Sequence, residues 1–261
     1  FYAYPVASII GRDFGDGEVV DVIRRRSTGR LLWFTVWQAA ASTLCTFVVG
    51  LPAAWVVARV ALPGRRLLRA LLVVPFVLPT LVVGAAVQAT FERFGLDGGR
   101  IDLQDTVWAI LFAHTVFNVA VVVRIVGGYW ALLDTGPEEA ARVLGASPWR
   151  VAWEVTLPRL AAPLRSAAGI VFLFCFPSFG VILTVGGPGN PTLETEIWRY
   201  ATQRTDFSTA AALALVQLVT VVVLVVAVNR LEGRLTRGVV AGRRPVVPER
   251  LVSWPRRLGA A

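Results

Sequence analysis

The chain is organised around Pro137-Glu138-Glu139-Ala140-Ala141-Arg142-Val143-Leu144-Gly145-Ala146-Ser147-Pro148-Trp149, a polar stretch in a sequence that is otherwise mostly apolar. Pro137 suits the first turn of a helix, and the two glutamates that follow it lie where the helix dipole favours negative charge. Gly145 can end this helix, because glycine adopts the left-handed conformation without steric cost. The stretch therefore predicts a short helix that stops at Gly145.

A second helix is predicted directly after the first. Ser147 can cap its first turn, and Pro148 fits its first helical position. Its apolar residues recur on one face at helical spacing, namely Trp149, Ala152 and Trp153. Two short capped helices, each with an apolar stripe and lying outside the membrane, need a surface to pack on.

Three interpretations of this stretch compete. An ordinary loop is disfavoured, because loops rarely carry both helix caps and periodic apolar faces. A pair of amphipathic helices lying on lipid would need a strongly cationic polar face, and the Glu138-Glu139 pair opposes binding to anionic headgroups. The third interpretation is a docking element for a cytoplasmic partner.

Composition indicates a membrane protein. The 261 residues are 56% apolar and only 16% charged, which is too apolar for a usual soluble domain. The net charge of +9 raises nucleic acid as a partner, but the arginines are spread over the loops and are interpreted as orienting charges, so no nucleic acid is expected. Cys45 and Cys175 lie in apolar runs and are expected to be small core residues. The chain starts at Phe1 and contains no Met, so we expect a fragment or a trimmed chain.

Five apolar runs approach or exceed the roughly 20 residues that cross a bilayer. They predict an all-α fold, a polytopic transmembrane helix bundle with full spans over residues 31–58, 67–91, 106–133, 162–185 and 209–228. Residues 1–10 are too few to span and are interpreted as the end of a truncated first span. Pro52 is expected to bend its helix and Pro177 to break one.

The arginines orient these spans. Summed over alternate loops, sixteen arginines fall on one side and nine on the other, and the acidic residues lean the opposite way. The positive-inside rule then places residues 59–69 and 134–165 in the cytoplasm, and residues 95–105 and 186–208 outside.

A longer motif runs through the same stretch. Glu139-Ala140-Ala141, Gly145 and Val155-Thr156-Leu157-Pro158 have the spacing E-A-A-x3-G-x9-I-x-L-P, with Val155 in place of Ile as the one departure. This pattern resembles the EAA motif of binding-protein-dependent ABC importer permeases of type I fold, and a match over about twenty residues is specific. In that family the segment is the coupling helix that docks into a groove of the ATPase. The resemblance implies ATPase-coupling roles for Glu138, Glu139, Ala140, Ala141, Leu144, Gly145, Trp149, Leu157 and Pro158.

Shorter motifs are similar to those of the thiamine and ferric-iron branch of these permeases. They are Phe1-Tyr2-Ala3-Tyr4-Pro5-Val6, Trp37-Gln38-Ala39, the stretch from Ala113 to Asn118, the stretch from Cys175 to Gly187, and the stretch from Thr192 to Trp198. The resemblance is closest to the N-terminal half of a thiamine permease. It implies import of thiamine or a phosphorylated relative, with ferric iron as the alternative. It also implies a six-helix half that lacks its opening helix and is fused to a second half.

The resemblance implies partners as well. They are a cytoplasmic ABC ATPase dimer, an external solute-binding protein, the lipid bilayer and a second permease half in the same full-length chain, all at a bacterial cytoplasmic (inner) membrane. The chain itself has no nucleotide-binding motif, so it is expected to be a transport subunit rather than an enzyme, without a cofactor. The permease domain is expected over residues 1–230, with the coupling segment at 134–165. Residues 231–261 are expected to form a cytoplasmic linker or a disordered tail.

Few polar residues lie inside the predicted spans. His114 and Asn118 are one helical turn apart, and together with Gln38 and Ser178 they are candidates for a translocation path. The alternative is hydrogen bonding between helices, and Arg124 can instead extend toward the cytoplasm. With a single histidine and no acidic residue inside a span, we expect no catalytic residue and no metal site. A membrane-embedded enzyme, or a scaffold with a cytoplasmic docking site, is the alternative of another class.

Overall fold

Helices make up the regular structure of the part of the chain that the computed structural model describes. That part comprises residues 21–22, 24–60, 67, 74, 78–98 and 102–240, with only the backbone described for 231–240. The elements are α3 (Arg26–Arg59), α5 (Thr80–Phe94), α6 (Val107–Val122), the π-helical turn η1 (Val123–Gly127), α7 (Gly128–Trp130), α8 (Gly136–Val143), α9 (Pro148–Val151), the π-helical turn η2 (Ala152–Thr156), α10 (Leu157–Cys175), α11 (Gly180–Val185), α12 (Leu193–Thr202) and α13 (Phe207–Val240).

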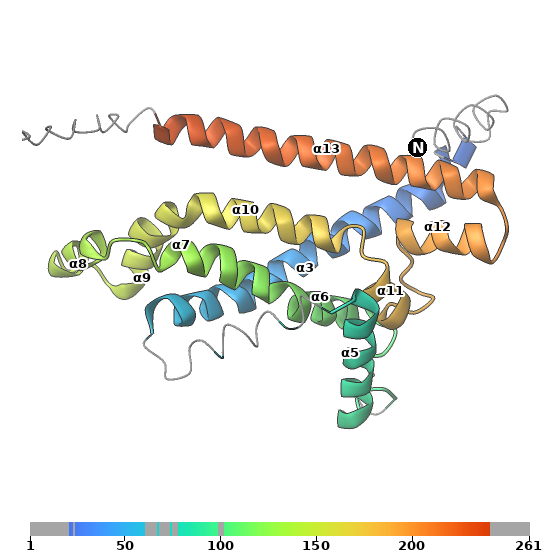
Figure 1. Cartoon of the computed structure of the whole chain (residues 1–261), viewed down its shortest axis with the longest axis horizontal. Helices are drawn as coiled ribbons and strands as arrows, with labels where there is room; N and C mark the ends of the chain where they lie inside the picture. The colour runs from blue at the N-terminus through green and yellow to red at the C-terminus, as the bar shows by residue number, and fades with distance from the viewer. Residues whose placement is uncertain are drawn as a thin grey trace, which may run out of the picture.

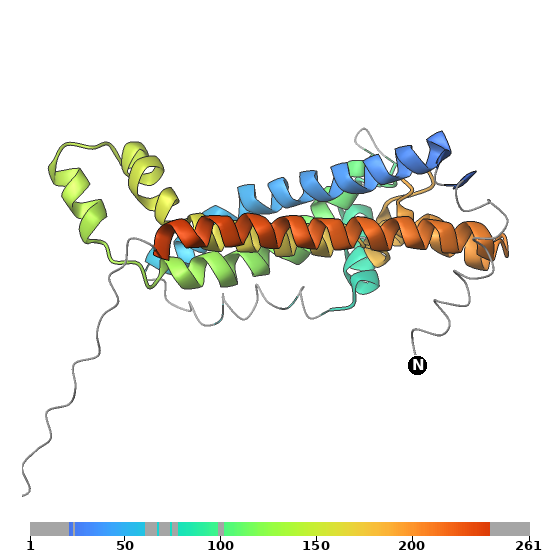
Figure 2. The same ribbon diagram turned by 90° about the horizontal axis from the view of Figure 1, so that it is seen from above.

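Four helical runs within the described residues are long and apolar enough to cross a membrane. They are Arg26–Arg59, Val107–Trp130, Pro148–Cys175 and Phe207–Arg230. They run in roughly the same direction, with α8 and α9 at one end of the bundle and α12 at the other (Figures 1 and 2). The arrangement confirms the predicted helical membrane bundle. It also puts the end of α3 and the coupling segment together at one end, as the arginine count predicts.

The predicted span over residues 67–91 is described only in part. Most of residues 61–77 lie outside the described residues, as do residues 1–20. The described part is α5, a helix of 15 residues that runs across the direction of the long helices (Figure 1). α5 packs on α6 and α11 through a small core of its own, formed by Val87, Phe91, Ala109, Ile110, Ala113, Val181, Ile182 and Val185.

The helix α3 has the side-chain pattern of a membrane helix. Its buried face is small and polar, with Thr35, Gln38, Ala39, Ser42, Thr46, Gly50 and Ala54. Its exposed face is apolar, with Trp33, Trp37, Leu44, Val48, Val49 and Trp55. Small residues allow close helix contact when lipid covers the apolar face, and a Cβ added at Gly50 would lie only 2.9 Å from the Cβ of Val122. α3 therefore faces the bundle with the surface that a soluble helix would show to water.

The coupling segment is continuous with a membrane span. We expected a separate short helix after Ser147 and a span that starts near residue 162, and this expectation was wrong. α9, η2 and α10 instead form one run of 28 residues, Pro148–Cys175. Pro158 lacks an N–H and crowds the carbonyl one turn before it, and the wider π-helical turn directly before it accommodates this. Residues 148–151 are therefore the first turn of the same helical run as α10.

The predicted break at Pro177 is confirmed, but the span ends earlier than predicted. α10 stops at Cys175, and residues 180–185 form the separate helix α11. α11 is tied to α5 because Gln88 Nε2 donates to the carbonyl of Thr184 at 2.5 Å. Residues 176–179 are thus a hinge-like connection between α10 and the small core at α5.

The last helix is longer than predicted. α13 extends to Val240, ten residues past the expected domain boundary at 230, so residues 231–240 are helical rather than part of a disordered tail. Residues 241–261 lie outside the described residues. α13 starts beside α12, whose own start is fixed by a capping box between Thr192 and Thr195.

Candidate functional site

The first helix of the coupling segment ends in a Schellman motif. The N–H of Gly145 donates to the carbonyl of Arg142 at 2.9 Å, and the N–H of Ala146 donates to the carbonyl of Ala141 at 3.0 Å. Gly145 has φ +85°, in the left-handed region, and open space lies where a Cβ would project. The prediction that Gly145 ends the helix is confirmed.

The second helix starts at the predicted cap. The Ser147 hydroxyl accepts a hydrogen bond from the N–H of Arg150 at 3.3 Å. The rings of Trp149 and Trp153 lie on one side of the helix with centroids 5.5 Å apart, packed edge to face. Four large apolar side chains are exposed around this turn, namely Val143, Leu144, Trp149 and Trp153. Leu144 is 87% exposed and Trp149 is 72% exposed, so the described chain leaves this apolar surface uncovered.

The two adjacent glutamates have different surroundings. Glu138 is buried, and its Oε1 accepts hydrogen bonds from Thr156 Oγ1 at 2.9 Å and from Arg59 Nη2 at 3.4 Å. Arg59 also donates to the carbonyl of Leu133 at 3.5 Å. Glu139 points outward and is exposed. Glu138 therefore ties α8 to the end of α3 and to η2, while Glu139 is available to another molecule.

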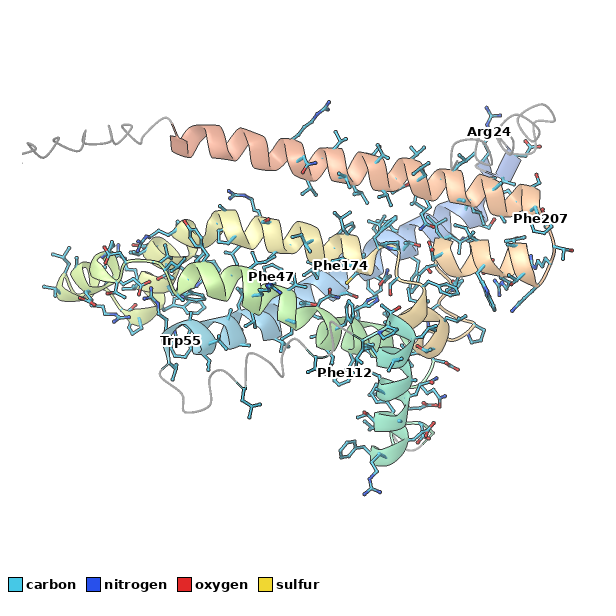
Figure 3. The ribbon with its side chains drawn as sticks, viewed as in Figure 1. Arg24, Phe47, Trp55, Phe112, Phe174 and Phe207 are labelled. Carbon is cyan, nitrogen blue, oxygen red and sulfur yellow. The ribbon has the colours of Figure 1, made fainter. Side chains whose placement is uncertain are left out.

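A groove runs between α8 and the end of α3. It has a volume of about 730 Å³ and is lined by Pro52, Trp55, Trp130, Glu139, Arg142 and Trp149, among others. Trp55 is labelled in Figure 3, at the end of α3 nearest to α8 and α9. Of the predicted coupling residues, Glu138, Glu139, Trp149 and Leu157 line this groove. Glu139, Ala140, Leu144, Gly145, Trp149 and Pro158 are exposed, Ala141 and Leu157 are half-buried, and Glu138 is buried.

The four candidates for a translocation path meet in the centre of the bundle. The hydroxyl of Ser42 lies 2.9 Å from His114 Nδ1, and the hydroxyl of Ser178 lies 2.8 Å from His114 Nε2. An imidazole with one donor and one acceptor nitrogen can satisfy both serines at once. Two amides complete this histidine cluster, which we define as Gln38, Ser42, His114, Asn118, Cys175 and Ser178.

Both amides point at Cys175. Gln38 Nε2 donates to the Cys175 carbonyl at 3.0 Å, and Asn118 Nδ2 donates to its Sγ at 3.4 Å. Gln38 Oε1 and Asn118 Oδ1 are buried and accept no hydrogen bond from the described residues. The cluster joins α3, α6, the end of α10 and the 176–179 connection, and it retains two acceptors for a further donor.

Sequence reasoning missed several members of both sites. Arg59 was read only as one charge in a basic turn, and Thr156 only as a motif position, although both hold Glu138. Ser42 was not considered, because serine is common in apolar helices and only the contact with residue 114 distinguishes it. Arg124 is exposed in η1 and is not part of the cluster. Among the described residues, no three His, Cys, Asp or Glu side chains gather to hold a metal.

The fold and the site together define a class: a polytopic helical membrane protein with an exposed apolar surface at one end. Residues 47–239 match a known family over most of the chain, and the chain belongs to the family of binding-protein-dependent transport system inner membrane components. It is therefore a membrane component of a transport system and not a catalytic enzyme.

Several named relatives are about one-third identical to this chain over the residues that align with it. The sulfate transport system permease protein CysT of Escherichia coli is 32% identical over 215 residues, covering 79% of this chain and 77% of its own. The thiamine permease protein ThiP of Brucella abortus is also 32% identical, but this chain spans only 39% of it. The molybdenum permease protein ModB of Mycobacterium bovis is 33% identical over 83% of this chain and 85% of its own. The predicted thiamine branch is therefore not singled out.

Solved structures share the fold. A permease chain of a bacterial alginate ABC transporter, crystallised with its pentasaccharide-bound periplasmic protein, has a TM-score of 0.71 at 17% identity and covers 90% of each chain. A chain of the MetNI methionine ABC transporter in an inward-facing conformation has a TM-score of 0.59 at 20% identity, covering 78% of this chain and 94% of its own.

Proposed function

We propose that this chain is the permease subunit of an ATP-driven importer in a bacterial cytoplasmic membrane, and that its coupling segment binds a separate ABC ATPase in the cytoplasm. The observation that carries the proposal is the exposed apolar turn at Leu144 and Trp149, beside a groove that ends at Glu139. Such side chains in water are costly unless a partner covers them. The arginine excess at the same end supports a cytoplasmic position.

The geometry suggests how the partner's motion reaches the membrane. α8 is tied to α3 through Glu138 and Arg59, and residues 148–151 are the first turn of the helical run that contains α10. A displacement of the turn at Gly145 therefore moves two membrane helices together. Alternating access in the family needs this kind of linked movement.

The test replaces Gly145 by aspartate and compares it with a matched control. Gly95 also has a left-handed φ, +66°, and open space around it, but it lies at the end of α5. Each substitution costs on the order of 1–2 kcal/mol in backbone strain. We expect Gly145→Asp to abolish uptake and co-purification of the ATPase at normal protein levels, and Gly95→Asp to transport normally. Equal transport by both variants would refute the docking role.

A second variant separates docking on protein from binding to lipid. Glu139→Lys reverses the charge of an exposed side chain at the groove. If Glu139 pairs with a group on the ATPase, the variant should lose uptake. If the segment instead adsorbs on anionic lipid, the variant should attach more tightly to the membrane and keep normal uptake. Uptake and ATPase co-purification are measured together.

For the substrate, we propose a small solute delivered by an external binding protein. Thiamine or a phosphorylated relative is favoured by the stretches around His114 and residues 186–197, and ferric iron is the alternative from the same motifs. Sulfate and molybdate are further candidates, because the sulfate and molybdenum permeases are as similar to this chain as the thiamine permease is. Uptake of the four labelled solutes in a deletion strain decides between them, and loss of none on deletion would remove all four assignments.

We further propose that the histidine cluster lies beside the translocation path. Its support is the pair of unsatisfied acceptors, Gln38 Oε1 and Asn118 Oδ1, next to the connection at residues 176–179. Asn118→Leu removes one acceptor while keeping a similar volume. A changed KM for uptake with normal ATPase binding is expected, and an unchanged KM would leave the cluster with a packing role alone.

The complete transporter needs two permease halves. Because this chain spans 39% of ThiP, we propose that its second half is supplied by the same full-length protein. Mass measurement of the natural gene product tests this directly, and a natural product of about this chain's length would point instead to a second copy or a separate subunit.

A further inference from the structure

A second cavity lies at the end of the bundle opposite to the coupling segment. It has a volume of about 400 Å³ and is formed where the start of α3 meets α12 and the start of α13. Figure 1 shows these three elements together at one end, and Figure 3 labels Arg24 and Phe207 there. The proposed importer function assigns no role to this cavity.

The polar side of the cavity is positively charged. Arg25, Arg30 and Arg199 line it, with Glu196 as the one acidic side chain among its described lining residues. Glu196 pairs with Arg199, which leaves Arg25 and Arg30 in excess. Arg25 also acts electrostatically on Asp206, which lies outside the lining. The Nε of Arg199 is buried and donates to no acceptor among the described residues.

Backbone dipoles add to this charge. α3 starts at the cavity without a side-chain cap, and its first turn carries no acidic residue. Ser27 and Thr28 in that turn line the cavity. The uncapped start of a 34-residue helix and two excess arginines are together the donors that a phosphate group needs.

The other side of the cavity is apolar and lies within the spans. Leu31 and Phe34 belong to α3, and Leu213 belongs to α13. Arg25 and Arg30 stand where the apolar run of α3 starts, which is the level of lipid headgroups. A free anion would gain nothing from the apolar side, whereas a phospholipid could place its headgroup at the arginines and an acyl chain along it.

We propose that this cavity is a phosphate-binding site, occupied by the headgroup of an anionic phospholipid. Arg25 and Arg30 bind the phosphate oxygens as charged donors, and the apolar side holds the acyl chain. The lipid binds at the membrane surface opposite to the proposed ATPase end, and its binding does not depend on the identity of the transported solute.

The experiment measures binding by the purified full-length chain in detergent. One arm titrates phosphatidylglycerol against phosphatidylcholine of equal acyl length, and the other titrates inorganic phosphate at constant ionic strength, both followed by native mass spectrometry and thermal unfolding. We expect phosphatidylglycerol to bind and raise the Tm. Arg25→Gln/Arg30→Gln should weaken that binding about tenfold or more, since charge-assisted hydrogen bonds are lost.

The matched control is Arg24→Gln. Arg24 is an exposed neighbour that carries the same charge but does not line the cavity. It should bind phosphatidylglycerol like the wild type. Equal weakening by Arg24→Gln would show general charge attraction and overturn the site. Binding of inorganic phosphate that is lost in the double variant, without any preference for phosphatidylglycerol, would keep the phosphate site but refute the lipid as its source. Equal binding of either ligand by wild type and double variant would overturn the proposal.

Discussion

The turn at Gly145 in the coupling segment exposes apolar side chains, whereas the histidine cluster buries polar ones. The turn leaves Leu144 and Trp149 in solvent, whereas the cluster encloses Gln38, His114 and Asn118 in the middle of the bundle. The exposed apolar groups find no cover within the described chain, while most of the buried polar groups are satisfied by neighbouring helices. We propose that the first region binds another molecule, whereas the second mainly holds the chain itself together. Substitutions in the two regions should therefore fail in different assays.

The largest effect is expected from Leu144→Asp together with Trp149→Ala. Both side chains are mostly exposed, so the stability of the isolated chain should fall by no more than about 1 kcal/mol, most of it from the lost ring contact with Trp153. Loss of a central apolar anchor should nevertheless abolish ATPase binding and uptake. Co-purification and uptake, measured beside the Tm, check this. A lower Tm with normal uptake would reverse the comparison.

The opposite result is expected from His114→Ala. It leaves the hydroxyls of Ser42 and Ser178 without the ring and opens a cavity, so we expect a loss of about 3 kcal/mol in the free energy of unfolding. Thermal unfolding in detergent measures it. Thr115→Ala is the control on the same helix, because among the described residues Thr115 bonds only to the carbonyl of Leu111, one turn earlier, and its loss should cost far less. Equal losses would deny the cluster its structural role.

Glu138→Gln tests a residue that lies in the coupling segment but is buried and hydrogen-bonded like the members of the histidine cluster. The amide keeps a hydrogen bond from Thr156 but loses the charge that faces Arg59, so we expect a loss of roughly 1–2 kcal/mol, with partial uptake. Glu139→Gln, one position further on, should leave the Tm unchanged because Glu139 is exposed. A stability loss at 139 rather than 138 would contradict the assigned orientations.

The smallest effect is expected at Asp206, outside both regions. Its carboxylate accepts a hydrogen bond from the N–H of Thr209 at 3.0 Å, and this bond, with help from Arg25 and Arg204, lowers its pKa below the usual 3.8. A lowered carboxyl pKa gives stability above pH 3.8 that is lost as the pH falls through the lower folded pKa. Asp206 is half-buried, so solvent still screens its carboxylate and the amount is at most about 0.5 kcal/mol. Asp206→Asn should remove this acid dependence of the Tm, and an unchanged pH profile would contradict it.

Local features of the coupling segment could be predicted from the sequence because they depend on neighbours in the chain. The stop at Gly145, the cap at Ser147 and the break at Pro177 each follow from backbone chemistry within a few residues. The continuity of Pro148–Cys175 was not predicted, because a proline such as Pro158 inside a helical pattern normally indicates the end of a helix. Only the structure shows the π-helical turn before Pro158 that accommodates it.

Long-range features were harder to predict. Both glutamates suit a helix start, and the positions of Thr156 and of Arg59, 79 residues before Glu138, decide that Glu138 turns inward. His114 and Asn118 were placed on one face from their spacing, but their contacts with Ser42 and Cys175 depend on how three helices pack. The extension of α13 to Val240 was missed because its arginines hide any apolar periodicity.

The buried amide of Gln38 has a consequence for how the protein is made. The amide donates to the carbonyl of Thr35 in the same helix, but its second acceptor, the Cys175 carbonyl, is synthesised 137 residues later. At roughly 5–20 residues per second, the second bond forms on the order of ten to thirty seconds after Gln38 is made. During that time the apolar face of α3 has to hold the helix in the membrane, and the polar face has to be shielded by the insertion machinery. A ribosome that stalls before residue 175 should therefore leave α3 accessible to membrane quality-control proteases.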